Sequence, residues 1–369
     1  MKLYPATLWG EVTPPVSKSI LHRELICQAM CGEYPQIPAV PKDVQMTQRA
    51  LIALRDGEKI VDCGESGTTL RFLLPLAAAM GKRGVTFTGS PRLLERPVPA
   101  GLPIERTQKG WCIREALRSG AYLIDASRTS QVTSGLLMAL PLLEGDSVVR
   151  TENAVSSGYV DMTVSALHRY GIGIEKTPDG FAVPGGQKYQ IAPIKAETDW
   201  SAAAWYAMAN RLSNEVNITT ICNESKQPDK AILDYLDHLP DTVDISVAPD
   251  IFPVLALYAA LCPGKVTKMI HCAFLRDKES DRLRNVQKIL TALGVRVEVS
   301  EDTITIFGRD RLHGGVVIDP DRDHRMVFLA AFAALFCDEP IELLDSGCVS
   351  KSYPQFWKDY VALGGQIEE

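Results

Sequence analysis

The stretch Arg276-Asp277-Lys278-Glu279-Ser280-Asp281-Arg282 carries a formal charge on six of its seven side chains. An apolar run, 266–275, precedes this stretch, and a helical stripe of leucine and valine that ends at Gly294 follows it. We therefore expect the charges to lie in a loop between a strand and a helix, next to the positive end of the helix dipole. A solvated helix start with charge pairs at i,i+4 would give the same local pattern, so the interpretation depends on repetition.

The same order of strand, polar loop and apolar helix recurs along the chain. In the first half, 17–23 and the glycine-rich loop 63–71 each open an apolar helix, and in the second half 247–250 and 319–325 do the same. The alternating pattern at 296–307 adds a hairpin between helices. This duplication at the level of pattern predicts an α/β fold with two similar halves. Helix starts that converge from both halves would form one polar cleft.

Length and composition fit two folded domains. The chain has 369 residues, of which 46% are hydrophobic and 23% are charged, as in ordinary globular proteins. A passage rich in proline and glycine, 178–193, precedes a new apolar helix. We therefore place the change of domain close to residue 197.

Several classes of function are disfavoured by composition and by missing motifs. The net charge of −6 does not indicate binding to nucleic acid or to an anionic membrane. The first residues lack the pattern of a secretory signal, the apolar runs are too short to span a bilayer, and the odd number of nine cysteines fits a reducing cytoplasm. The phosphate-binding loop pattern and a complete dinucleotide fingerprint are absent, and the six histidines show no metal spacing. We therefore expect neither a metal nor an organic cofactor.

The polar loops supply seven basic side chains in a protein that is acidic overall, namely Lys18, Arg23, Arg96, Lys278, Arg282, Arg325 and Lys351. Their burial in one cleft would be unfavourable unless anions bind there, so we expect a substrate with more than one anionic group. The loops also carry neutral groups that suit hydroxyls or phosphate oxygens, although each alone is more often a helix cap: Ser19, Thr68, Ser130, Gln131 and Ser156. Two candidate acids, Asp250 and Glu279, predict group transfer between small phosphorylated metabolites with general acid–base help.

Eight short motifs, taken in order, resemble those of the EPSP synthase family, the 3-phosphoshikimate 1-carboxyvinyltransferases, along nearly the whole chain. They are Ser17-Lys18-Ser19 with Arg23, Ser66-Gly67-Thr68 with Arg71, Glu95-Arg96-Pro97, Thr129-Ser130-Gln131 with Leu136-Leu137-Met138, Tyr159-Val160-Asp161-Met162-Thr163, Lys278-Glu279-Ser280-Asp281-Arg282, Asp323-His324-Arg325-Met326, and Lys351-Ser352-Tyr353-Pro354. One such piece would be weak, whereas the set in this order is highly specific.

The resemblance implies both a fold and an activity. The implied fold is α/β with two similar domains, each of three βαββαβ units in an inside-out α/β barrel, and with the active site in the interdomain cleft. One domain would span 15–197, and the other 1–14 plus 198–369. The implied reaction moves the enolpyruvyl group of phosphoenolpyruvate to the 5-hydroxyl of shikimate 3-phosphate and releases phosphate, in the shikimate pathway to chorismate and aromatic amino acids. The implied enzyme is a cytoplasmic monomer without a cofactor or metal and without nucleic-acid or membrane partners.

The resemblance also assigns roles to residues, motif by motif. Shikimate 3-phosphate would be held by Lys18, Ser19, Arg23, Thr129, Ser130, Gln131, Ser156, Asp250 and Lys278. Phosphoenolpyruvate would be held by Lys18, Gly67, Arg96, Gln131, Arg282, Arg325 and Lys351. Asp250 would take the proton from the attacking hydroxyl, while Glu279 and Lys18 are candidates for proton delivery to the methylene carbon.

The chain departs from the usual family pattern in side chains and in length. Glu65 stands where Asn is common, Thr129 where Ser is usual, Phe274 where a polar residue is frequent, and Asp277 adds a carboxylate. The spans 31–43 and 97–125 are short. We therefore expect part of one repeat in the first domain to be trimmed.

Two alternatives stay open at this point. The UDP-N-acetylglucosamine enolpyruvyl transferases share the architecture but carry a reactive cysteine just before their Arg-Pro-Val sequence, where 90–95 of this chain has none. A non-catalytic relative would keep an anion-binding cleft and lose turnover. Asp250 and Glu279 argue against such a relative, because anion binding alone gives no reason to place acids there.

Overall fold

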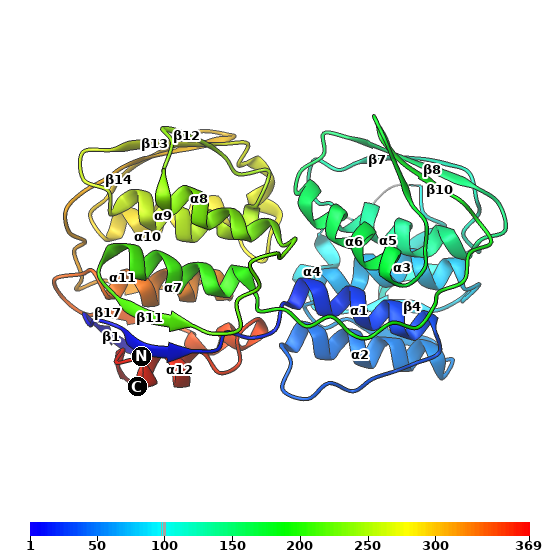
Figure 1. Cartoon of the computed structure of the whole chain (residues 1–369), viewed down its shortest axis with the longest axis horizontal. Coiled ribbons are helices and arrows are strands. Elements are labelled where there is room, and N and C mark those ends of the chain that lie inside the picture. Colours follow the sequence, from blue (N-terminus) through cyan, green and yellow to red (C-terminus); the bar gives the residue numbers. More distant parts are fainter. Residues whose placement is uncertain (97, 99–100) are drawn as a thin grey trace. The chain divides into compact units, whose positions relative to one another are not determined.

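The computed structural model describes residues 1–96, 98 and 101–369. The chain divides into two compact units, which are coloured along the sequence in Figure 1. Ser17–Ala196 form the contiguous unit, and Met1–Val16 with Glu197–Glu369 form the split unit. Pro97, part of one quoted motif, lies outside the described residues. Among those residues, no helix combines the length and the apolar character needed to cross a membrane.

The contiguous unit contains the helices α1 (Lys18–Met30), α2 (Lys42–Arg55), α3 (Gly67–Ala79), α4 (Pro91–Glu95), α5 (Gln131–Ala139) and α6 (Ser157–Arg169), and the 3-10 helix η1 (Leu140–Leu142). Its strands are β3 (Ile60–Asp62), β4 (Thr86–Thr88), β5 (Ile104–Thr107), β6 (Gly110–Ile113), β7 (Ala121–Asp125), β8 (Ser147–Glu152), β9 (Glu175–Thr177) and β10 (Gly180–Val183). Proline at the first position of α4 and its cap Ser90 favour the start of this short helix.

The split unit contains the helices α7 (Trp200–Leu212), α8 (Ile232–Asp237), α9 (Phe252–Ala260), α10 (Arg282–Ala292), α11 (His324–Ala334) and α12 (Phe356–Ala362). Its 3-10 helices are η2 (Pro228–Ala231), η3 (Pro249–Ile251), η4 (Ala273–Asp277) and η5 (Ser346–Lys351). Its strands are β1 (Lys2–Tyr4), β2 (Trp9–Val12), β11 (Glu215–Ile218), β12 (Thr242–Asp244), β13 (Val266–Ile270), β14 (Arg296–Val299), β15 (Thr303–Phe307), β16 (Val317–Ile318), β17 (Ile341–Leu343) and β18 (Gln366–Glu368). The expected hairpin at 296–307 is present as β14 and β15.

Within the described residues, four sheets of four strands share one topology, which confirms the predicted α/β class. Their strand orders are β3-β4-β6-β5, β7-β8-β10-β9, β12-β13-β15-β14 and β16-β17-β1-β18. In each sheet the first two strands are parallel, and the other two complete it in antiparallel pairing. Along the chain a repeat reads strand, helix, strand, helix and then hairpin. A hairpin therefore closes the repeat in three of these sheets, and in the fourth the sequence-distant strands β18 and β1 take the place of the hairpin. The expected order βαββαβ places the hairpin in the middle instead.

Each unit holds two such complete repeats and a reduced third one. In the split unit, the third consists of the parallel pair β2 and β11 with α7 and α8. In the contiguous unit, the described residues add only α1 and α2, joined directly by 31–41, and no further strand. The segment 187–196 runs along α1 instead, where Gln28 Nε2 donates to the Ala192 carbonyl at 2.6 Å and Glu24 accepts from the Lys195 N–H. Side chains of α1 thus satisfy backbone groups that a sheet would satisfy by strand pairing.

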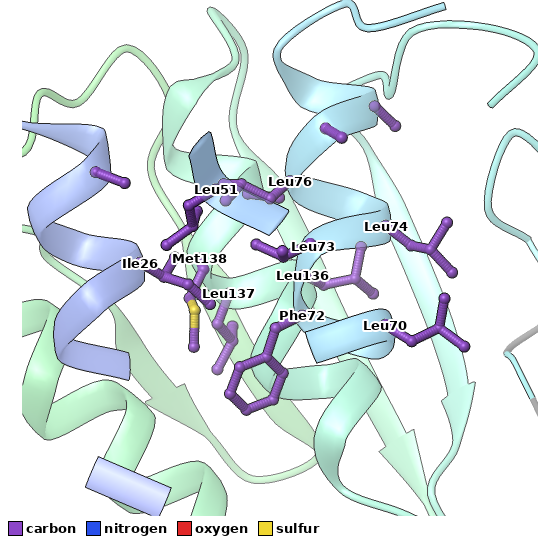
Figure 2. Packing of buried hydrophobic residues seen from close by; sticks show 14 of the residues in the cluster. Ile26, Leu51, Leu70, Phe72, Leu73, Leu74, Leu76, Leu136, Leu137 and Met138 are labelled. Carbon is purple, nitrogen blue, oxygen red and sulfur yellow. The ribbon is translucent and has the colours of Figure 1, made fainter. Parts of the chain in front are cut away.

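The helices form the centre of each unit because their apolar residues surround the whole helix. Every residue of α9 and of α11 is buried, which is typical of a helix enclosed on all sides. In the contiguous unit α3 and α5 are buried almost as completely. Figure 2 shows side chains of α1, α2, α3 and α5, among them Ile26, Leu51, Leu73 and Met138, in one cluster. The polar first turns of these enclosed helices are therefore held in fixed positions.

Gly135 allows α3 and α5 to pack closely. A Cβ atom at this position would lie 2.5 Å from the carbonyl oxygen of Arg71 and 2.9 Å from the ring of Pro75. Both neighbours belong to α3, and neither is the flexible end of a side chain.

We predict that Gly135→Ala lowers the free energy of unfolding by about 1–3 kcal/mol, because one methyl group overpacks this contact. Gly173→Ala is the matched control in the same unit, since its nearest atom beyond the local backbone would be at 3.6 Å. Thermal unfolding of both variants measures the difference. Equal melting temperatures would contradict the close approach of α3 and α5.

Candidate active site

The charged stretch that opened the sequence analysis lies directly before α10. Strand β13 ends at Ile270, earlier than the apolar run suggested, and η4 follows it. Asp281 caps α10 by accepting a hydrogen bond from the Arg284 N–H at 3.0 Å. The polar loop before a helix start is thus present as predicted.

Arg282 is buried, which decides against a solvated helix start. Its side chain is 2% exposed, and each of its three nitrogens donates to a carboxylate. Nη2 lies 2.6 Å from Glu279 and Nη1 2.9 Å from Asp250, while Nε lies 2.8 Å from Asp323. Three charge-assisted hydrogen bonds compensate for the desolvation of this guanidinium group.

Asp250 bridges two arginines of the split unit. Its Oδ1 accepts from Arg282, and its Oδ2 lies 2.8 Å from Nη2 of Arg325. Burial alone would raise the pKa of Asp250, but the charges of Arg325, Arg282 and Lys278 outweigh burial and hold the pKa well below its usual range. Asp250 is therefore a weak base in the free protein.

Asp323 was quoted in a motif but was not assigned a role in the site. It is fully buried and caps α11 by accepting from the Arg325 N–H at 2.9 Å. Its other oxygen accepts from Arg282 and, at 3.1 Å, from the Ser280 hydroxyl. Its bond to Arg282 joins residues 41 positions apart, which no local sequence pattern indicates.

Two lysines complete the predicted set in this unit. Lys278 lies with its Nζ 4.7 Å from the centre of the Phe274 ring, and its charge contributes to the low pKa of Asp250. Lys351 is buried at the end of η5, the 3-10 helix that packs against α11. The split unit therefore gathers its predicted residues at the starts of α9, α10 and α11 and beside α11.

Gly67 begins α3 at a point where two guanidinium groups converge. A Cβ atom at this position would lie 2.7 Å from Nη1 of Arg71 and 2.9 Å from Nη1 of Arg96. A Cβ atom would push the ends of these two side chains away, so glycine permits both cations to approach a helix N-terminus, which itself favours anions. Arg71, which the site prediction did not include, donates to Gln131 Oε1 at 2.8 Å. Gln131 in turn donates to the Thr68 hydroxyl at 3.0 Å.

Arg23 is buried among neutral oxygens. It donates to Thr163 Oγ1 at 2.8 Å and to the carbonyls of Ser19 and Tyr159. Burial lowers the pKa of Arg23 to about 10, which still leaves it charged at neutral pH. A buried cation with neutral partners favours the binding of an anion.

Lys18 differs from Arg23 in having an acidic partner. Its Nζ lies 3.0 Å from Asp43 Oδ2, and the two side chains are 15% and 7% exposed. Sequence analysis did not identify Asp43, which lies 25 residues away on α2 and belongs to no motif. The position of the Lys18 side chain is therefore tied to a second helix, α2.

Three hydroxyl groups of the predicted site lie at helix starts of the contiguous unit. Ser156 precedes α6 in the left-handed region at φ 59°, is 4% exposed, and its Oγ has no hydrogen-bond partner among the described atoms. Such strain with an unpaired buried hydroxyl is typical of a binding position. Ser130 is the buried residue before α5, and Thr129 Oγ1 accepts from the Gln131 N–H at 3.2 Å.

Comparisons with known proteins agree in one family. The family model described as EPSP synthase (3-phosphoshikimate 1-carboxyvinyltransferase) matches residues 42–240 and 235–360. Proteins named 3-phosphoshikimate 1-carboxyvinyltransferase from Clostridium acetobutylicum and Clostridium botulinum are 35% and 34% identical, over 100% of this chain and 98% of each relative. The alignment with the first spans 430 positions, so that relative carries segments that this chain lacks.

Solved structures show the same fold. An EPSP synthase from Acinetobacter baumannii has a TM-score of 0.77 at 22% identity, covering 100% of this chain and 98% of its own. The enolpyruvyl transferase NikO from Streptomyces tendae has a TM-score of 0.74 at 17% identity, with the same coverage.

A chain of buried hydroxyls leads from α3 to His22. The oxygens of Ser66 and Thr69 lie 2.7 Å apart, those of Thr69 and Thr47 2.6 Å apart, and Thr47 lies 2.7 Å from His22 Nδ1. Burial, opposed by Asp43, lowers the pKa of His22 to about 3. His22 is therefore neutral in the folded protein, and its ring is connected through Thr47 of α2 to Thr69 of α3.

We predict that His22→Asn reduces the loss of stability in acid. The pKa of His22 is about 3 when folded against 6.5 for the ordinary residue, so below pH 6.5 the unfolded chain binds a proton that the folded chain does not. The free energy of unfolding then falls by up to about 1.4 kcal/mol per pH unit. Denaturant unfolding at about pH 7 and about pH 5 measures this slope for both proteins. Identical slopes would mean that His22 is charged in the folded state.

Proposed function

Because the chain belongs to the EPSP synthase family, we propose that it moves the enolpyruvyl group of phosphoenolpyruvate to the 5-hydroxyl of shikimate 3-phosphate, with release of phosphate. The product, 5-enolpyruvylshikimate 3-phosphate, leads to chorismate and the aromatic amino acids. The observation that carries this function is the match at 35% identity over the whole chain. The paired arginines and acids of the split unit suit a reaction between two anionic substrates.

Shikimate 3-phosphate is assigned mainly to the contiguous unit. Arg23, buried among neutral oxygens, is suited to one anionic group of this substrate. The hydroxyls before α5 and α6 are suited to phosphate oxygens, together with the free backbone N–H groups of those first turns. The assigned residues are Lys18, Ser19, Arg23, Thr129, Ser130, Gln131, Ser156, Asp250 and Lys278.

Phosphoenolpyruvate is assigned to guanidinium and ammonium groups of both units. Arg282 and Arg325 present planar donors of the kind that bind carboxylate or phosphate. Gly67, with Arg96 next to it, permits close approach of an anion to the start of α3. The assigned residues are Lys18, Gly67, Arg96, Gln131, Arg282, Arg325 and Lys351.

The proposed chemistry is an addition followed by an elimination. Asp250 removes the proton of the 5-hydroxyl as its oxygen bonds to C2 of phosphoenolpyruvate, and Glu279 or Lys18 delivers a proton to the methylene carbon. The resulting tetrahedral intermediate loses a proton from the new methyl group and expels phosphate, which restores the double bond. Cations around the phosphate stabilise the charge that develops on it.

The proposal further places the enzyme in the cytoplasm as a monomer, with its two small-molecule substrates as its partners. All nine cysteines are free thiols, which suits a reducing compartment. A UDP-sugar enolpyruvyl transferase is the rival activity. Its reactive cysteine has no counterpart at 90–95, and Cys112, farther along, is a buried residue of β6.

We predict that the purified protein releases phosphate from phosphoenolpyruvate when shikimate 3-phosphate is present and not when it is absent. A coupled phosphate assay with each substrate alone and with both measures this. Phosphate release with UDP-N-acetylglucosamine in place of shikimate 3-phosphate would transfer the assignment to the rival, and no release with either acceptor would favour a non-catalytic relative.

We predict different effects of Asp250→Ala and Arg23→Ala. Loss of a general base should reduce kcat about 10²–10⁴-fold and leave most of the affinity for shikimate 3-phosphate. Loss of the buried guanidinium should weaken that affinity about ten-fold to a hundred-fold, because a charge-assisted hydrogen bond is removed. Calorimetric titration and steady-state kinetics separate the two effects, with Arg55→Ala as a control because Arg55 is exposed and pairs with the adjacent Asp56. Equal losses of binding would contradict the division of roles.

A further inference from the structure

Asp250 and the proposed phosphoenolpyruvate site use the same two guanidinium groups. Both oxygens of Asp250 are engaged, one by Arg282 at 2.9 Å and the other by Arg325 at 2.8 Å. Under the proposed function, on which this inference rests, these arginines bind the anionic groups of phosphoenolpyruvate. In the free protein the proton acceptor therefore occupies part of the site of the second substrate.

We propose that phosphoenolpyruvate competes with Asp250 for Arg282 and Arg325, and that Asp250 becomes an effective proton acceptor only when this competition displaces it. Asp250 then serves as an internal ligand of the empty site, and the arriving substrate releases the base that the reaction needs.

Exposure indicates which carboxylate of the network is displaceable. The side chain of Asp323 is 0% exposed and caps α11, and that of Glu279 is 15% exposed in the loop just before α10. The side chain of Asp250 is 26% exposed and lies in η3, a single turn. Arg282 can therefore keep two carboxylate partners while its Nη1 turns to an incoming anion.

Displacement from the two arginines makes Asp250 a stronger base. The charges that face Asp250 are Arg282, Lys278 and Glu279 from the start of α10 and Arg325 from α11. Displacement weakens the stabilising contacts with both arginines and places a negatively charged substrate nearby, while the desolvation of Asp250 persists. Each of these changes favours the protonated carboxyl, so Asp250 becomes more basic in the presence of phosphoenolpyruvate.

The first test is phosphoenolpyruvate binding without the second substrate. Asp250→Asn removes the competing charge at nearly constant shape, so calorimetric titration should show about ten-fold tighter binding than for wild type. The matched control is Asp321→Asn. This substitution also removes a carboxylate near the start of α11, but that carboxylate accepts a hydrogen bond from Asn285. Its φ of 52° is tolerated by Asn. Unchanged or weaker binding by Asp250→Asn would overturn the proposal, as would an equal gain in the control, which would indicate general charge repulsion.

The second test uses the wild-type chain and does not depend on a folded variant. Sulfate is the probe, because it does not titrate near pH 5 and carries the same kind of anionic oxygens. If sulfate displaces Asp250, the pKa of Asp250 rises on binding, and the complex takes up protons at about pH 4–5. Calorimetry in two buffers of different ionisation enthalpy measures this uptake, and its absence would overturn the exchange. Both tests measure binding alone and are therefore independent of the phosphate-release assay. An active transferase can fail both tests, which would overturn the exchange but not the proposed function. A protein that releases no phosphate can still pass them.

Discussion

The structure of the split unit depends on one buried guanidinium group held by three carboxylates. Asp250 precedes α9, Glu279 precedes α10 and Asp323 caps α11, so Arg282 connects the starts of three helices, of which α9 and α11 are enclosed. Removal of one partner from a buried ion network typically costs about 3–5 kcal/mol, because a charge is left uncompensated. The positions of the reactive acids are therefore fixed by the same contacts that stabilise the unit.

The buried arginines of the two units have different kinds of partner. In the split unit each arginine of the site has a carboxylate partner, so the empty site is already neutralised. In the contiguous unit Arg23 is bonded to neutral oxygens, and two guanidinium groups converge on Gly67 at a helix start. In the split unit, an incoming anion must therefore replace a carboxylate of the protein. In the contiguous unit, the cations are already arranged to bind an anion from solution.

Sequence reasoning found what is local and missed what depends on the path of the chain. Polar loops before apolar helices are local signals, so the positions of Asp250, Glu279 and Arg282 at helix starts follow from the pattern. The burial of Arg282 does not follow from it, because the same charges would suit a solvated helix. Asp43 and Asp323 were missed as partners because ion pairs join residues 25 and 41 positions apart. The place of the hairpin in each repeat also depends on which strands pair, and periodicity does not specify pairing.

The pairing of β1 has a consequence for the order of folding during synthesis. Leu3 lies between Ile341 of β17 and Ile367 of β18, so the first strand of the chain is an interior strand of the last sheet. On the ribosome the contiguous unit can emerge whole and fold early, whereas residues 2–4 remain unpaired until β17 and β18 have been made. A nascent chain therefore carries β1 as an unsatisfied strand while the residues between β1 and β17 are made, and this sheet closes later than the sheets built from strands that are near in sequence.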